Sequence, residues 1–326
     1  MRCTNNKQMR LLCILCVAAL FITGCGASDI SENPYQVYSS SMSQYDGENS
    51  NFDFFSKDLC VKEDVNIGMD TVDSQVAEGA GVFNLDTKEI PYSQNLFKRL
   101  YPASTTKILT AYIIIKNCNL TDMVTVSENA VAQAADSSVC GLNAGDVISV
   151  NDLLYGLMLA SGNDAAIALA EYYAGSVEAF SEIMNEEALM LGATGSHFVN
   201  PSGLPDENHY TTVYDMYLIF KEAISYDSFV NIISTLNYNA SYQDAAGNET
   251  TNTWNNTNRF LTGRSEVPEG FTIVGGKTGT TGAAGYCLVL YSLNAKGERI
   301  ISIVFKADGP SNLYLLTGQI LKGYAN

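Results

Sequence analysis

Two polar side chains lie three residues apart at the start of an apolar stretch, "YPASTTKILTAYIIIK" (101–116). The apolar spacing behind Pro102 predicts a buried helix that begins near Ser104 or Thr105. One helical turn then places Ser104 and Lys107 on the same face. A serine hydroxyl becomes a useful nucleophile when a neighbouring base takes its proton. Lysine can be that base only if burial and positive potential lower its pKa from about 10.4 towards neutrality. For the motif alone, a helix-capping Ser104 beside an exposed Lys107 is the simpler interpretation.

Two further short motifs favour the catalytic interpretation of Ser104 and Lys107 over the helix-capping one. With 28 serines and 12 lysines in 326 residues, about one Ser-x-x-Lys is expected by chance. A Ser-Gly-Asn motif at 161–163 falls in the predicted corner between two helices, where both polar side chains can project into a cleft. A Lys-Thr-Gly motif at 277–279 lies in a predicted strand, and roughly 0.07 such triplets are expected by chance. Glycines beside it let an extended substrate approach the sheet edge.

The elements that position these motifs follow from the apolar periodicity of the chain. Two short strands are predicted within 79–95 and three within 271–309. Helices are predicted at 104–116, 150–158, 163–174, 176–191, 213–225 and 311–323. Residues 240–265 are polar and are expected to form a long surface excursion. Strands at both ends with helices between them predict an α+β domain, with one antiparallel sheet and an inserted helical subdomain.

In this order, Ser-x-x-Lys, Ser-x-Asn and Lys-Thr-Gly resemble the signature of the penicillin-binding and serine β-lactamase superfamily. The flanking stretches look like those of low-molecular-mass D-alanyl-D-alanine carboxypeptidases: "YPASTTKILT", "LMLASGNDAAIALAE", "FVNPSGL" and "GGKTGTTGAAGYC". The resemblance covers roughly residues 75–326. It implies a five-stranded antiparallel sheet flanked by helices, with an inserted all-helical subdomain at about 117–265.

The resemblance also implies a role for each motif residue. Ser104 attacks the carbonyl of the penultimate D-alanine of a peptidoglycan stem and forms an acyl-enzyme, with Lys107 as its base. Ser161 relays the proton to the leaving amine, and water later releases the shortened peptide. The backbone N–H groups of Ser104 and Thr280 form the oxyanion hole. The residues expected to bind the substrate are Asn163, Lys277, Thr278, Gly279 and Thr280.

The same residues leave other activities open. A D,D-endopeptidase that cuts peptide cross-links uses them too and differs in the cleft. A class A β-lactamase needs a deacylating glutamate in a Glu-x-x-x-Asn loop, whereas Glu207 is followed directly by Asn208. The resemblance therefore implies β-lactams as long-lived covalent inhibitors. An inactive wall-binding lipoprotein on the same fold is the non-enzymatic alternative.

Histidine count and charge exclude several other classes. His197 and His209 are the only histidines, and no Gly-x-Ser-x-Gly or His-Glu-x-x-His motif accompanies them. Neither a Ser-His-Asp hydrolase nor a zinc peptidase is favoured, so we expect both histidines to be structural and no metal or cofactor to be needed. The formal charge of −17 does not attract polyanions, and nucleic acid is not an expected partner.

One position departs from the family pattern. Carboxypeptidases of this group often carry an arginine near the final strand that grips the terminal carboxylate of the substrate. The stretch "FKADGPSNLY" offers only Lys306 there. The departure weakens the case for strict carboxypeptidase specificity.

The first 25 residues, "MRCTNNKQMRLLCILCVAALFITGC", have the features of an export signal. The apolar segment of 12 residues (11–22) is too short for a comfortable membrane span. The run 22–25 resembles the bacterial lipoprotein box, in which the cysteine thiol receives a diacylglycerol. We therefore expect a lipoprotein signal peptide at 1–24, lipidation of Cys25, a flexible tether at 25–64 and a catalytic domain at 65–326. The protein would be anchored to the outer face of the bacterial cell membrane.

Overall fold

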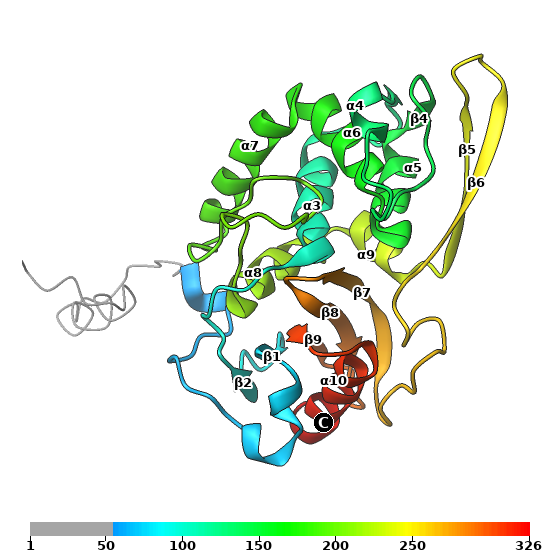
Figure 1. The fold of residues 1–326 in the computed structure, drawn as a ribbon. Helices are drawn as coiled ribbons and strands as arrows, with labels where there is room; N and C mark the ends of the chain where they lie inside the picture. The colour runs from blue at the N-terminus through cyan, green and yellow to red at the C-terminus, as the bar shows by residue number, and fades with distance from the viewer. Residues whose placement is uncertain (1–54) are drawn as a thin grey trace, which may run out of the picture. The chain divides into compact units, whose positions relative to one another are not determined.

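The computed structural model describes residues 55–326, and its central feature is a five-stranded antiparallel sheet with helices on both faces (Figure 1). The strand order is β2-β1-β9-β8-β7. These strands span Gly79–Asn84 (β1), Tyr92–Gln94 (β2), Thr272–Thr281 (β7), Gly285–Leu293 (β8) and Arg299–Ala307 (β9). Because β1 pairs with β9, the first hairpin joins the last three strands in one sheet. The predicted α+β class and the predicted sheet are confirmed.

Both faces of the sheet are buried, which explains the almost continuous apolar run of β9, "RIISIVFKA". Ile301, Ile303 and Phe305 face the larger core, which also contains buried residues of α3 (Lys107–Asn117) and α8 (Val213–Ala223). Ile300 and Val304 face a second core beneath α10 (Pro310–Tyr324). The sheet is therefore a fixed platform for any residue at its edge.

The remaining helices lie mostly in the segment inserted between β2 and β7 (Figure 1). They are α4 (Glu128–Val131), α5 (Val150–Tyr155), α6 (Asn163–Ala174), α7 (Val177–Met190) and α9 (Asp227–Ser234), with a π-helical segment η6 (Gly156–Ala160). The 3₁₀ turns are η2 (Phe55–Asp58), η3 (Met69–Thr71), η4 (Ser74–Val76) and η5 (Ala103–Thr106). The predicted helices are all present, within a few residues of their expected ends.

The prediction of an all-helical insert is wrong, because the insert also holds a second antiparallel sheet of order β3-β4-β5-β6. Its strands are β3 (Met123–Thr125), β4 (Val147–Ser149), β5 (Asn237–Gln243) and β6 (Glu249–Asn255). The β5–β6 hairpin was expected to be an irregular excursion because its outward face is Asn- and Thr-rich. Its inward face carries Ala240, Tyr242 and Trp254, all buried. A strand with so few apolar residues gives a weak alternation signal.

Residues 55–64, which were expected to belong to the flexible tether, lie within the part of the chain that the structure describes. Cys60 is fully buried, its N–H donates to the Tyr217 hydroxyl at 2.9 Å, and its carbonyl accepts from the Tyr214 hydroxyl at 2.8 Å. These contacts fix the chain against α8. The expected signal peptide, Cys25 and the first part of the expected tether lie outside the described residues.

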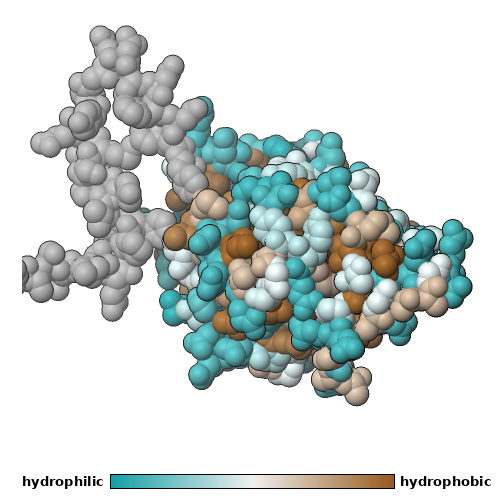
Figure 2. Space-filling view, turned by 90° about the horizontal axis from the view of Figure 1, so that it is seen from above, coloured by the Kyte–Doolittle hydropathy of each residue, from teal (hydrophilic) through white to brown (hydrophobic). Residues whose placement is uncertain are grey.

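The surface of the described part is mixed in polarity. In Figure 2 apolar residues lie in small separate patches among hydrophilic ones on the face shown. Several of the large apolar side chains that are exposed belong to different elements, as with Met123, Leu189 and Leu315. Among residues 55–326, no helix has both the length and the apolar content needed to cross a membrane.

Candidate active site

Ser104 lies in the 3₁₀ turn η5, which leads directly into α3. The residue before it, Ala103, has φ of 49°, a left-handed conformation that costs a non-glycine residue about 1–2 kcal/mol. Such backbone conformations persist where the surrounding structure holds them, often at functional sites. Here Gly203 lies against the Ala103 carbonyl, so closely that a Cβ at residue 203 would be 1.8 Å from that oxygen. The turn that presents Ser104 is thus held from outside its own helix.

Changing Gly203 to alanine is expected to lower the free energy of unfolding by about 2–5 kcal/mol, because a left-handed φ of 86° and a backbone clash add together. Gly247→Ala is the matched control, since Gly247 has φ of 83° with nothing within 4 Å of the added Cβ. The control is expected to lose only the conformational cost of about 1–2 kcal/mol. Urea denaturation measures both, and equal losses would contradict the contact with Ala103.

Lys107 is fully buried at the start of α3, and its Nζ has three close neighbours. The Nζ lies 2.7 Å from Asn163 Oδ1, 2.7 Å from Ser202 O and 3.2 Å from Ser104 Oγ. Burial, and after it the charge of Lys277, lowers the pKa of Lys107 well below the usual 10.5. A neutral amine has two N–H groups and one lone pair. Because the amide and peptide oxygens can only accept, both N–H groups are used on them and the lone pair is left for the Ser104 hydroxyl proton.

The loop around residues 197–210 supports this geometry through His209. The buried Nδ1 of His209 accepts from Val199 N–H at 3.2 Å, so its Nε2–H donates to Thr106 Oγ1 at 2.8 Å. Burial lowers the pKa of His209 to about 4. The imidazole is therefore neutral. Its hydrogen bond holds Thr106, the residue directly before Lys107. The expected structural role of His209 agrees with these contacts.

Ser161 and Asn163 come from the corner between η6 and α6. Ser161 ends the π-helical segment with φ of 60°, and α6 begins at Asn163. π-Helical segments inside helices frequently occur at functional sites. The buried Asp164 carboxylate accepts from the backbone N–H groups of residues 140–142, which fixes the adjoining loop. This corner brings two polar side chains to the buried lysines.

Lys277, Thr278 and Thr280 lie on β7, the edge strand of the main sheet. The Nζ of Lys277 donates to Ser161 Oγ at 3.0 Å and to Thr278 O at 2.9 Å. Complete burial lowers the pKa of Lys277 to about 7. Gly279 is buried against the nucleophile turn, where a Cβ would be 3.0 Å from Ser104 N. Its absent side chain therefore allows β7 to approach Ser104.

All eight residues expected at the site are brought together: five form two hydrogen-bonded groups, and Thr278, Gly279 and Thr280 line the cleft beside them. One group joins Lys107 to Ser104 and Asn163, and the other joins Lys277 to Ser161. The expected relay from Lys107 through Ser161 is not among the hydrogen bonds of the described residues. In the structure Asn163 contacts Lys107, and Ser161 contacts Lys277.

A cleft of about 310 Å³ lies over these groups and holds two cations that sequence reasoning missed, Arg259 and Arg264. Their loop docks beside β7, where Thr257 Oγ1 lies 2.6 Å from Thr278 Oγ1. Lys306, the cation that the sequence offered near the final strand, is instead paired with Glu78 and does not line this cleft. The sequence offered one indication of these two arginines: the loop that carries them directly precedes the Lys-Thr-Gly strand in the chain.

The two lysines predict a bell-shaped pH dependence of kcat/KM for a substrate with a terminal carboxylate. Lys107 must be neutral to act as a base, and burial together with the charge of Lys277 lowers its pKa well below 10.5. Lys277 must stay charged to attract a carboxylate, and it loses its proton with a pKa of about 7. Activity is therefore expected to rise as Lys107 deprotonates and to fall above about pH 7. Lys277→Arg should remove the alkaline limb, because arginine keeps its charge. An alkaline limb unchanged in that variant would contradict the assignment.

Comparison with known proteins agrees across sequence and structure. A family model described as D-alanyl-D-alanine carboxypeptidase matches residues 69–309. The chain is 36% identical over 241 residues to D-alanyl-D-alanine carboxypeptidase DacF of Bacillus subtilis, covering 72% of this chain and 58% of that protein. It is 37% identical over 222 residues to D-alanyl-D-alanine carboxypeptidase DacC of Escherichia coli, covering 65% of this chain and 52% of that protein. The crystal structure of the Streptomyces K15 DD-transpeptidase superposes with a TM-score of 0.70 at 32% identity, covering 77% of this chain and 98% of that one. The chain thus spans between half and three fifths of the two curated relatives.

Proposed function

Since its residues 69–309 match the family model, this chain belongs to the D-alanyl-D-alanine carboxypeptidase family, and on that premise we propose that it removes the terminal D-alanine from peptidoglycan pentapeptide stems. The observation that carries the proposal is the Lys107 amine, buried and 3.2 Å from Ser104 Oγ with its other two neighbours both acceptors. A lysine in this state can take a proton from serine at neutral pH.

The proposed reaction has two halves. Lys107 takes the Ser104 hydroxyl proton while Oγ attacks the carbonyl carbon of the penultimate D-alanine. The backbone N–H groups of Ser104 and Thr280 stabilise the oxyanion, and each such donor is worth about 3–4 kcal/mol in a serine protease. The C–N bond then breaks, and the leaving D-alanine amine receives a proton through Ser161. Water attacks the acyl-enzyme in the second half and releases the shortened peptide. β-Lactams would acylate Ser104 in the same way and leave slowly.

Recognition of the free terminal carboxylate favours a carboxypeptidase over an endopeptidase. Thr278, Arg259 and Arg264 line the cleft, and the buried Lys277 precedes Thr278 on β7. Charge-assisted hydrogen bonds to a carboxylate are about twice as strong as neutral ones. An endopeptidase substrate has a peptide chain at this point instead of a terminal carboxylate. The cations of the 256–265 loop thus take the role expected of an arginine near the final strand.

Mass spectrometry of two muropeptides after incubation with the protein tests this proposal. A pentapeptide stem is expected to lose one alanine, while a cross-linked dimer stays intact. Cleavage of the dimer would establish the D,D-endopeptidase activity instead. Rapid opening of benzylpenicillin with turnover would indicate a β-lactamase. A folded protein that changes neither muropeptide and forms no covalent penicillin adduct would be the inactive wall-binding alternative.

We further propose that the protein acts outside the cytoplasm and is anchored by lipid at Cys25. The support is the run of small residues before that cysteine at the end of the apolar segment 11–22. Two or three acyl chains are enough for stable anchoring. Metabolic labelling with an alkyne fatty acid is expected to mark the full-length protein and to fail in Cys25→Ala. Labelling that persists in the variant would overturn the anchor without touching the catalytic proposal.

A further inference from the structure

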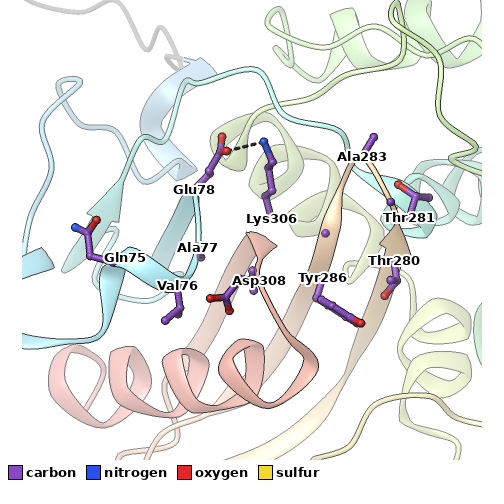
Figure 3. A pocket seen from close by; sticks show the side chains of 13 residues that line it. Gln75, Val76, Ala77, Glu78, Thr280, Thr281, Ala283, Tyr286, Lys306 and Asp308 are labelled. Carbon is purple, nitrogen blue, oxygen red and sulfur yellow. Dashed lines mark ion pairs between the residues drawn. The ribbon is translucent and has the colours of Figure 1, made fainter.

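A second cavity of about 640 Å³ adjoins the catalytic cleft at the far end of β7 (Figure 3). We call it the stem groove. It shares Thr280 and Tyr286 with the catalytic cleft, so the two spaces are neighbours at this end of β7. The polar groups that line it include Gln75, Glu78, Thr281, Lys306 and Asp308. None of these has a part in the chemistry proposed above.

The groove wall is shaped by an irregularity at the end of β9. Lys306 has φ of 56°, which is unfavourable for a long side chain, and the β8–β9 register shifts between Tyr286 and Leu288. Bulges of this kind re-aim side chains and are common next to active sites. Figure 3 shows Lys306 turned to Glu78, with an Nζ–Oε1 distance of 2.5 Å. Lys98 contacts the other oxygen of Glu78 at 3.0 Å, so two lysines satisfy that carboxylate.

Asp308 is the carboxylate of the groove that stays available. Its side chain is exposed, and one oxygen accepts from Asn312 Nδ2 at 2.8 Å. No other hydrogen bond or ion pair reaches its side chain from the residues that the structure describes. An incoming ammonium group would thus meet Asp308 before it met the Glu78 carboxylate, which is already paired.

The direction of β7 decides which part of a substrate reaches this groove, and this step rests on the proposed function. The terminal carboxylate belongs beside Lys277 and Thr278, and the scissile carbonyl belongs at the Thr280 N–H. The part of the substrate that runs from its terminal carboxylate to its scissile carbonyl therefore follows β7 towards Thr281. A peptide added to this free edge is antiparallel to β7 and continues at about 3.4 Å per residue. The stem residues that precede the two D-alanines then enter the groove.

We propose that the stem groove binds the acyl side of the peptide stem, and that Asp308 pairs with the ammonium end of its diamino residue. Cross-linkable stems need a side-chain amine, which gives the groove a defined cationic ligand. Lys306, held by Glu78, forms the wall along which the peptide backbone lies. The groove makes the protein selective for stems whose amine is still free over stems whose amine is already acylated.

The test compares kcat/KM for two pentapeptides ending in D-alanyl-D-alanine, one with a free side-chain amine and one with that amine acetylated. The wild-type protein is expected to prefer the free amine by about threefold to fivefold, the size of one solvent-exposed ion pair lost. Asp308→Asn is expected to reduce the preference to about one. Asp86→Asn is the matched control, since Asp86 pairs with Arg299 at the opposite end of β1 and β9 and is expected to keep the wild-type preference.

The outcomes separate the groove from the catalytic proposal. A wild-type protein that releases D-alanine from both peptides at equal rates, or an Asp308→Asn variant that keeps the preference, overturns the groove alone. A wild-type protein that releases no D-alanine from either overturns the proposed function and the groove with it. Binding of the tetrapeptide product to Ser104→Ala protein, followed by calorimetry, gives a readout without turnover. There the affinity for the free-amine product is expected to fall about threefold to fivefold on adding Asp308→Asn.

Discussion

Ser104→Ala is expected to abolish covalent labelling by a fluorescent penicillin and to lower D-alanine release by on the order of 10⁶-fold, the loss seen on removing the nucleophile of a serine protease. The physical reason is that no other hydroxyl lies beside the Lys107 amine at a comparable distance among its hydrogen bonds in the described residues. The fold should be retained, because the Ser104 side chain makes one hydrogen bond there and fills little space. Gel fluorescence measures labelling, and circular dichroism measures folding.

The matched control is Ser225→Ala. Ser225 is exposed after α8, and its hydroxyl donates to Glu222 O at 2.6 Å. Labelling of this variant is expected to equal that of the wild type. Persistent labelling of folded Ser104→Ala at another serine would mean that the acyl-enzyme forms elsewhere and that the mechanism is wrong.

Lys107→Met is expected to slow acylation by penicillin by about 10²–10⁴-fold, the usual contribution of a positioned general base. Methionine fills the buried space but cannot accept the Ser104 proton. It also leaves Ser202 O and Asn163 Oδ1 without the N–H groups that each now receives at 2.7 Å. We therefore expect some loss of stability, about 1–3 kcal/mol for each buried acceptor left unpaired. Stopped-flow measurement of acylation separates this chemistry from binding.

Lys116→Met on the same helix is the control for this variant. Lys116 is partly exposed, pairs with Glu187 at 2.8 Å and is not among the residues that line the cleft. It is expected to lose some stability, because the buried Glu187 carboxylate loses its partner, and to acylate at the wild-type rate. The residual acylation of Lys107→Met should also lose its acid limb, because the group that titrates is gone. An acid limb identical to that of the wild type would assign the base to another residue.

Much of the fold followed from local patterns. Alternation along 271–309 predicted the strands that became β7, β8 and β9, and the helical spacing after Ser104 predicted α3. The β5–β6 hairpin was missed because its packing face is small and its other face is polar. Its Tyr238 ring stacks on Tyr155 with centroids 3.7 Å apart, a contact between residues far apart in the sequence. A single-sequence pattern carries no information about such a partner.

For the candidate site, too, the sequence predicted some features and the tertiary structure decided others. The sequence by itself determined which side chains could do chemistry and the order in which the chain supplies them, because a helical turn sets the Ser104–Lys107 spacing and a strand exposes its edge. The roles of these residues stay predictions until the experiments above are done. Only the tertiary structure decided that the pKa of Lys107 is lowered well below its usual range, since that shift comes from burial and from Lys277, which lies on another element. It also placed Arg259 in the cleft and turned Lys306 away, because the path of a loop and a bulge in a sheet are set by packing between distant segments.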